Sequence, residues 1–146
     1  MGSVDDDVAR RRAERAEAAT AHAEAQRRRE EQESARAQEM IDRFLVRAAE
    51  QRLATEELTA RPWTGRGRYR TGLVGWHLKR DRSVGVDTEG RFYVLVVAPE
   101  RLGRWRTVSV PPSPPPLQVG KGARDGESFA LDALLDLRLQ WQHPAG

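Results

Sequence analysis

The chain contains no cysteine among its 146 residues. Disulfides, thiolate zinc sites, iron–sulfur clusters and cysteine nucleophiles are therefore excluded together. Histidine is scarce as well, with only His22, His77 and His143, although it is the commonest general base in enzymes. His77 has a structured setting, in a predicted strand beside Trp76, but a strand histidine without a partner is usually a surface or packing residue. We expect no catalytic site, no metal and no cofactor.

Long apolar runs are also missing. The longest unbroken one, residues 93–99, is far too short to span a bilayer. The first twelve residues carry three aspartates and three arginines without an apolar stretch, unlike a secretory signal. These absences favour a cytoplasmic protein with no membrane partner.

Glycine and proline are absent from residues 8–60, which consist mainly of Ala, Arg, Glu and Gln. All four are strong helix formers. Ser3 can cap the first turn, the aspartates that follow it favour the positive end of a helix dipole, and Pro62 biases Arg61 away from helical geometry. The pattern predicts one long charged helix over residues 1–60.

The apolar stripe of this predicted helix is weak along its first half. Steps of three and four residues from Ala9 keep one register but meet mostly alanine and charged side chains. A two-stranded coiled coil would bury little there. A largely solvated helix and a weak coiled coil, used for self-association or for docking to a partner, both remain open.

Residues 40–58 differ, because large apolar side chains recur there at helical spacing. Such a face needs a cover, which is either the C-terminal domain of the same chain or a second chain in a homodimer. The candidate packing or self-association residues are Ile41, Phe44, Leu45, Ala48, Leu53 and Leu58.

The second half predicts a small α+β domain. Residues 61–72 are rich in Gly and Arg and are expected to form a hinge loop. Residues 73–146 predict an antiparallel β-meander of three or four strands covered by a C-terminal helix. The predicted strands cover residues 73–78, 84–86, 92–98 as a central strand, and 105–110. A hairpin turn at 87–90, a rigid proline-rich crossover at 111–116, a turn-rich loop at 120–126 and a helix over 127–141 complete the domain.

Charge divides the chain at the same point. Residues 1–60 hold 11 basic and 14 acidic residues, whereas residues 61–146 hold 14 basic and 8 acidic ones. Between residues 61 and 106 there are 11 basic residues against 4 acids, with Trp63, Tyr69 and Trp76 interleaved. Arginine attracts phosphate and aromatic rings stack on unpaired bases. The candidate nucleic-acid contacts are Arg66, Arg68, Tyr69, Arg70, Lys79, Arg80 and Arg82, whereas Trp76 alternates with apolar neighbours and is expected in the core.

Two functional hypotheses follow. The first is a non-enzymatic interaction or assembly protein that uses its helical segment to bind itself or an unknown protein partner. The alternative is a nucleic-acid-binding accessory protein that uses the basic loop and strand surface of residues 61–106.

Overall fold

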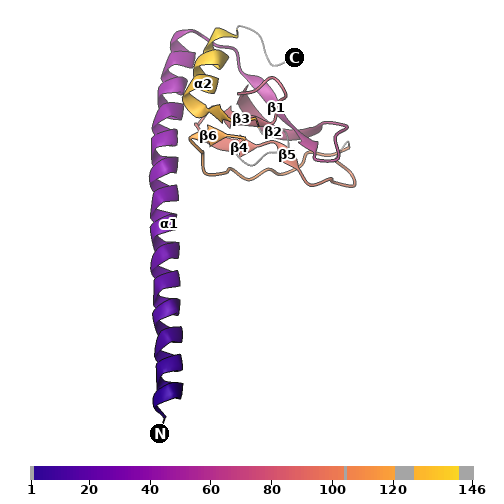
Figure 1. Cartoon of the computed structure of the whole chain (residues 1–146). Helices are drawn as coiled ribbons and strands as arrows, with labels where there is room; N and C mark the ends of the chain where they lie inside the picture. Colours follow the sequence, from indigo (N-terminus) through magenta and orange to yellow (C-terminus); the bar gives the residue numbers. More distant parts are fainter. Residues whose placement is uncertain (1, 104, 121–126, 142–146) are drawn as a thin grey trace. The chain divides into compact units, whose positions relative to one another are not determined.

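The computed structural model describes residues 2–103, 105–120 and 127–141. The chain divides into two compact units, residues 1–33 and residues 34–146. The fold is mixed α+β, with a long N-terminal helix, a mainly antiparallel sheet and a C-terminal helix, as predicted (Figure 1).

Helix α1 covers Ser3–Glu50, and its first part forms the N-terminal unit. No described residue of that unit is buried. Its stability comes from helix propensity and from local contacts such as the 2.6 Å ion pair between Arg10 and Asp7.

The helix ends ten residues earlier than the sequence predicts. The N–H of Leu53 donates to the carbonyl oxygen of Ala48, and the N–H of Arg52 donates to that of Ala49. Arg52 has a φ of 54°. This is the Schellman arrangement, which normally uses glycine at the left-handed position. Because arginine occupies that position, the sequence carried no visible signal for the end of the helix.

Strand β1, Glu56–Pro62, replaces the predicted last turns of the helix. It pairs antiparallel with β2, Tyr69–His77, so the predicted hinge loop at 61–72 is instead a hairpin with parts of both strands. Leu58, Ala60 and Pro62 are buried at alternate positions of β1, which is the period of a strand. Leu58 therefore belongs to the sheet and not to the helix face.

The sheet has the strand order β4-β3-β2-β1-β5, where β3 is Val84–Asp87, β4 is Phe92–Val94 and β5 is Val96–Val97. Only Leu95 separates β4 from β5, yet they form opposite edges of the sheet. The sheet therefore curls until its two edges meet at Leu95. The N–H of Leu95 donates to the carbonyl oxygen of Ser83, and the carbonyl oxygen of Leu95 accepts from the N–H of Arg61.

Two strand predictions are corrected by this closure. Residues 92–98 do not form a central strand, because their two halves pair with different neighbours, β3 and β1. Residues 105–110 form no strand, although the N–H of Val108 donates to the carbonyl oxygen of Arg70 and keeps this segment beside β2. The predicted turn at 87–90 is confirmed, with Gly90 at a φ of 89°.

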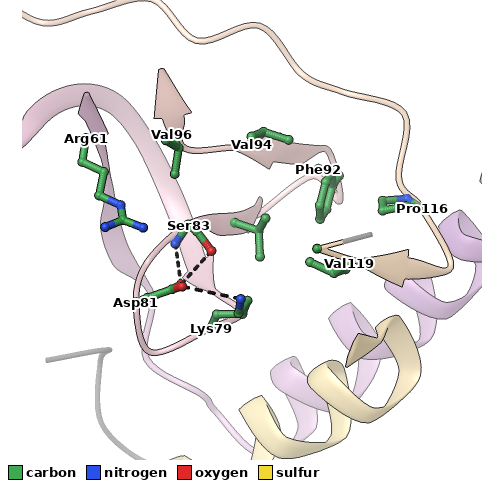
Figure 2. A pocket seen from close by; sticks show the side chains of 11 residues that line it. Arg61, Lys79, Asp81, Ser83, Phe92, Val94, Val96, Pro116 and Val119 are labelled. Carbon is green, nitrogen blue, oxygen red and sulfur yellow. Dashed lines mark hydrogen bonds and ion pairs between the residues drawn. The ribbon is translucent and has the colours of Figure 1, made fainter. Parts of the chain in front are cut away.

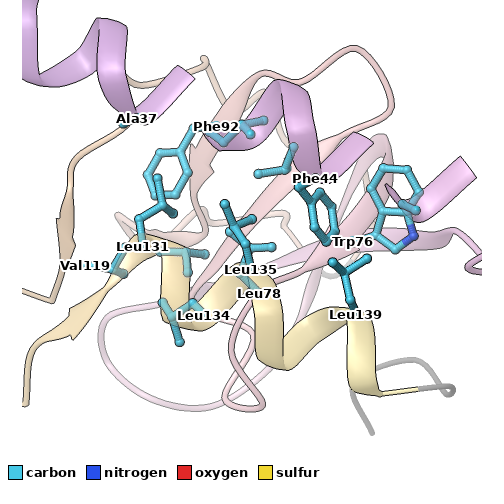
Figure 3. Packing of buried hydrophobic residues seen from close by; sticks show 14 residues of the cluster. Ala37, Phe44, Trp76, Leu78, Phe92, Val119, Leu131, Leu134, Leu135 and Leu139 are labelled. Atoms are coloured by element: carbon cyan, nitrogen blue, oxygen red, sulfur yellow. The ribbon is translucent and has the colours of Figure 1, made fainter. Parts of the chain in front are cut away.

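The larger hydrophobic core lies where α1, the sheet and α2 meet (Figure 3). Ile41, Phe44 and Ala48 of α1 are buried there, and the rings of Phe44 and Trp76 pack edge to face with centroids 5.5 Å apart. Leu45 and Leu53 are partly buried against the same cluster. The chain's own domain thus covers the apolar face of the helix.

A second core fills the curled sheet, with Leu58, Ala60, Tyr69, Tyr93, Leu95 and Val108. The C-terminal part adds a two-stranded sheet, β6 at Gln118–Val119 and β7 at Phe129–Ala130, followed by α2 at Leu131–Gln140. The predicted helix over 127–141 therefore starts four residues late, because Phe129 and Ala130 pair with β6. In the crossover at 111–116, Pro115 is buried and Ser113 forms a bridge with Phe92. Residues 121–126 of the predicted loop at 120–126 lie outside the described residues.

Candidate nucleic-acid interface

The hairpin between β1 and β2 presents an aromatic and several basic side chains to solvent. Trp63 is 68% exposed, and Arg66 and Arg68 are exposed beside it. Gly65 and Gly67 have φ values of 104° and 101°, which residues with a side chain rarely adopt. The glycines thus shape a tight loop that projects its tryptophan and arginines.

A second loop, residues 98–107, of which the structure describes 98–103 and 105–107, lies beside this hairpin. The Tyr69 hydroxyl accepts a hydrogen bond from the N–H of Glu100 at 3.1 Å and donates to its carbonyl oxygen at 3.4 Å. The N–H of Trp63 also donates to the carbonyl oxygen of Val97 at 3.0 Å. Both loops therefore extend from the same end of the sheet (Figure 1).

Trp105 in the second loop is 82% exposed. We call hairpin 63–68 and loop 98–107 together the aromatic tip. Among the described residues of the tip and at Arg70, which follows the hairpin on β2, five arginines are exposed, namely Arg66, Arg68, Arg70, Arg101 and Arg106, against one acid, Glu100. Within the described residues, no ion pair or side-chain hydrogen bond engages any of these five guanidinium groups. The tip thus combines free positive charge with uncovered aromatic surface.

The predicted contact residues fall into three groups. The first group is exposed at the tip or next to it and consists of Arg66, Arg68 and Arg70. Tyr69 is buried and holds the two loops together through its hydrogen bonds with Glu100. Lys79, Arg80 and Arg82 lie in or beside the turn between β2 and β3.

Lys79 and Arg80 of that turn are engaged by their own chain. The ammonium of Lys79 lies 3.5 Å from Asp81, and the guanidinium of Arg80 lies 4.2 Å from the centre of the Trp141 ring. These cations are less available to a ligand than the arginines of the hairpin.

A polar cavity of about 370 Å³ joins the hairpin to this turn. Its lining includes Arg61, Arg68 and Arg82 together with the two glycines of the hairpin and Asp81. Burial raises the pKa of Asp81, but hydrogen bonds from Ser83 and the charge of Lys79 outweigh it and leave the pKa below its ordinary value. Three arginines around one carboxylate leave the cavity positive, which suits a phosphate group.

Sequence reasoning missed Trp105 as a candidate, because residues 105–110 were assigned to a strand. Its neighbours Gly103 and Arg106 indicate a basic loop, but only tertiary contacts, such as the packing of Gly103 against the Tyr69 ring, place that loop beside the hairpin. Trp76, predicted in the core, is buried there.

His77 lies away from this surface in a buried polar cluster. Its Nδ1 atom lies 2.8 Å from Glu56, and its Nε2 atom accepts a hydrogen bond from the N–H of Thr59 at 3.3 Å. Both ring nitrogens are therefore occupied, and the residue packs the sheet as the sequence suggests.

Comparison with known proteins places no constraint on the function. No known protein family, curated protein or solved structure matches this chain. Among the described residues, no group of three His, Cys, Asp or Glu side chains could hold a metal ion. In the same part of the chain, no helix combines the length and apolar character needed to cross a membrane.

Proposed function

We propose that this protein binds single-stranded nucleic acid, without catalysis, through the aromatic tip. The observation that carries the proposal is the exposure of Trp63 and Trp105 on two loops that Tyr69 holds together. Exposed apolar surface rimmed by polar residues is typical of interaction sites, and here arginines flank the two indoles in the sequence. A base stacked on an indole contributes about 1–3 kcal/mol, and every base offers such a face.

The charge of the tip supports the same ligand. Among the described residues, five exposed arginines in the tip or next to it stand against a single acid, and arginine pairs with phosphate through two parallel hydrogen bonds. The polar cavity beside the hairpin adds Arg61 and Arg82. Single strands are favoured over duplexes because paired bases hide their faces from the indoles.

The test is fluorescence anisotropy with a labelled 15-nucleotide single strand, as DNA and as RNA, across a series of salt concentrations. We expect saturable binding whose affinity falls steeply as salt rises. A duplex of the same length should bind more weakly. Absence of saturable binding at low salt, or tighter binding to the duplex, would contradict the proposal.

Two double variants separate the stacking from the charge. Trp63→Ala with Trp105→Ala should lower affinity at least about tenfold at every salt concentration, because two stacking surfaces are lost. Arg66→Gln with Arg68→Gln should lower the slope of log affinity against log salt by about 1.4, the expected value for two lost phosphate contacts on a single strand.

The matched control is Arg11→Gln with Arg12→Gln, which removes the same charge from exposed positions of α1. For this control, the slope of log affinity against log salt should equal that of the unmodified protein within error. If both arginine variants change the slope equally, binding follows net charge alone and the tip has no special role.

Assembly through the helix is a second candidate function. The residues of the predicted self-association face are covered by the chain's own domain or lie outside α1, so this role would use residues 3–33. No residue of that range is buried within the chain. Light scattering over a range of concentrations tests it, and a monomer mass throughout would exclude a homodimer. We retain the cytoplasm as the expected compartment for either function.

A further inference from the structure

A second cavity, of about 500 Å³, shares two lining residues, Arg61 and Asp81, with the polar cavity beside the hairpin. Its volume is within the range of sites for small molecules. The apolar part of its lining is formed by Pro116 of the crossover and by five strand residues, Val84, Phe92, Val94, Val96 and Val119. These five side chains come from β3, β4, β5 and β6, so several separate strands contribute to its wall (Figure 2).

The polar part of the lining is concentrated on one wall. Arg61, Lys79, Asp81 and Ser83 form it, and Figure 2 shows the guanidinium of Arg61 directed toward Asp81 and Ser83. The carboxylate of Asp81 already has hydrogen-bond partners, because it accepts from the Ser83 hydroxyl at 2.6 Å and from the Ser83 N–H at 3.0 Å. The Nζ atom of Lys79 also forms an ion pair with the Asp81 carboxylate at 3.5 Å.

Arg61 is the member of this wall that lacks a partner. Its Nε atom is buried and has no hydrogen-bond acceptor among the described residues. A buried donor in this state costs free energy that an incoming acceptor can recover. Two cations against one carboxylate also leave the wall with a net positive charge.

From these observations we propose that the cavity binds a small alkyl carboxylate, with its hydrocarbon part against the valines and its carboxylate on Arg61. Four of the six apolar side chains are valines and one is aromatic, which favours a flexible alkyl chain over a flat ring. The guanidinium fork matches the two oxygens of a carboxylate. Arg61 lines both cavities, but the valines lie outside the aromatic tip, so octanoate binding is tested separately from nucleic-acid binding.

The experiment titrates the full chain with octanoate below its micelle concentration and follows backbone amide shifts by NMR. We expect saturable binding of one octanoate with shifts centred on Val84, Val94 and Val96. Two matched ligands separate the contribution of the carboxylate from that of the hydrocarbon chain. The first, 1-octanol, lacks the charge, and the second, acetate, lacks the chain. Both should bind at least about tenfold more weakly, as expected for loss of a charged hydrogen bond or of the buried chain.

Three variants test the residues. Arg61→Gln should abolish the preference for octanoate over octanol, whereas Arg61→Lys should retain part of it. Val94→Asp places a carboxylate at the cavity and should weaken octanoate at least about tenfold through repulsion. Val94 is 45% exposed, so this variant should stay folded.

Arg70→Gln is the control, because Arg70 is exposed on β2 and does not line the cavity. It should leave octanoate binding unchanged, as should the tryptophan double variant of the tip. Equal affinity for octanoate and octanol in the unmodified protein, or no saturable binding of either, would overturn the proposal. An equal loss in Arg61→Gln and Arg70→Gln would also overturn it, because the effect would then follow net charge.

Discussion

The Nε atom of Arg138 in α2 donates a hydrogen bond to the carbonyl oxygen of His77 in β2 over 2.8 Å. Arg138 is fully buried, and its guanidinium lies 3.8 Å from Glu56 of β1. The carboxylate of Glu56 in turn accepts a hydrogen bond from the backbone N–H of His77 at 2.8 Å, and it also contacts the Nδ1 atom of the His77 ring. Since His77 Nε2 accepts from Thr59, the neutral ring carries its proton on Nδ1 and donates it to Glu56. Three elements are thus joined by one buried polar cluster.

Replacing Glu56 should reveal how much this cluster stabilises the fold. In Glu56→Gln the buried guanidinium loses its compensating charge, so the free energy of unfolding should fall by about 2 kcal/mol. Glu57→Gln, at the exposed neighbouring position, should change it by less than about 0.5 kcal/mol. Urea denaturation at neutral pH measures both, and equal effects would show that the cluster adds little.

The protein should lose stability in acid through the carboxylates whose pKa folding lowers, which are Glu56, Asp87 and the Asp81 of the polar cavity. Burial raises the pKa of Glu56, but its hydrogen bonds with His77 and the charge of Arg138 outweigh burial and lower the pKa. Burial likewise raises the pKa of Asp87, and hydrogen bonds from Arg91, Tyr93 and Glu89 outweigh it. A pKa lowered by folding gives stability that is complete above the unfolded value and is lost as pH falls through the folded value.

We therefore expect the free energy of unfolding to be level between about pH 5 and 7 and to decline below about pH 4, where unfolded Asp and Glu titrate. Asp87→Asn should be less stable at neutral pH and show a shallower decline, because one contributing carboxylate is gone. Glu14→Gln, exposed in α1, should retain the full decline. Urea melts at several pH values measure this, and an identical decline in all three proteins would exclude Asp87 as a source.

Gly75 should be irreplaceable in β2. A Cβ atom at this position would lie 2.0 Å from the carbonyl oxygen of Val86 and 2.6 Å from the Cα atom of Asp87, both in the backbone of β3. Gly75→Ala should therefore reduce the free energy of unfolding by about 3 kcal/mol. Val74→Ala, at the half-exposed adjacent position, should cost about 0.5 kcal/mol. A well-tolerated Gly75→Ala would mean that β2 and β3 are farther apart.

Packing of the helix face within one chain makes a further prediction. Ile41 is fully buried against the domain, so Ile41→Ala should cost about 2–5 kcal/mol. Val46→Ala, on the exposed side of the same helix, should cost less than about 0.5 kcal/mol. The denaturation midpoint should not depend on protein concentration, and a midpoint that rises with concentration would indicate that a second chain covers this face.

Local features of the chain were readable from the sequence, because neighbouring residues decide them. The absence of Gly and Pro from residues 8–60 indicates the long charged helix, although no side-chain hydrogen bond of the expected cap Ser3 is found within the described residues, and Gly90 determines the turn after Asp87. The concentration of arginine after residue 60 indicated a basic surface, but the sequence could not separate the buried Tyr69 from the exposed Trp105.

Only the tertiary structure decided where the helix stops and how the sheet closes. Residues 56–60 are compatible with a helix, yet they form β1, because pairing with β2 buries Leu58 and Ala60. The change of partners at Leu95 and the meeting of Glu56, His77 and Arg138 join residues far apart in the chain. Sequence periodicity records which residues are buried along one element, whereas the partner that buries them is selected by packing across the whole domain.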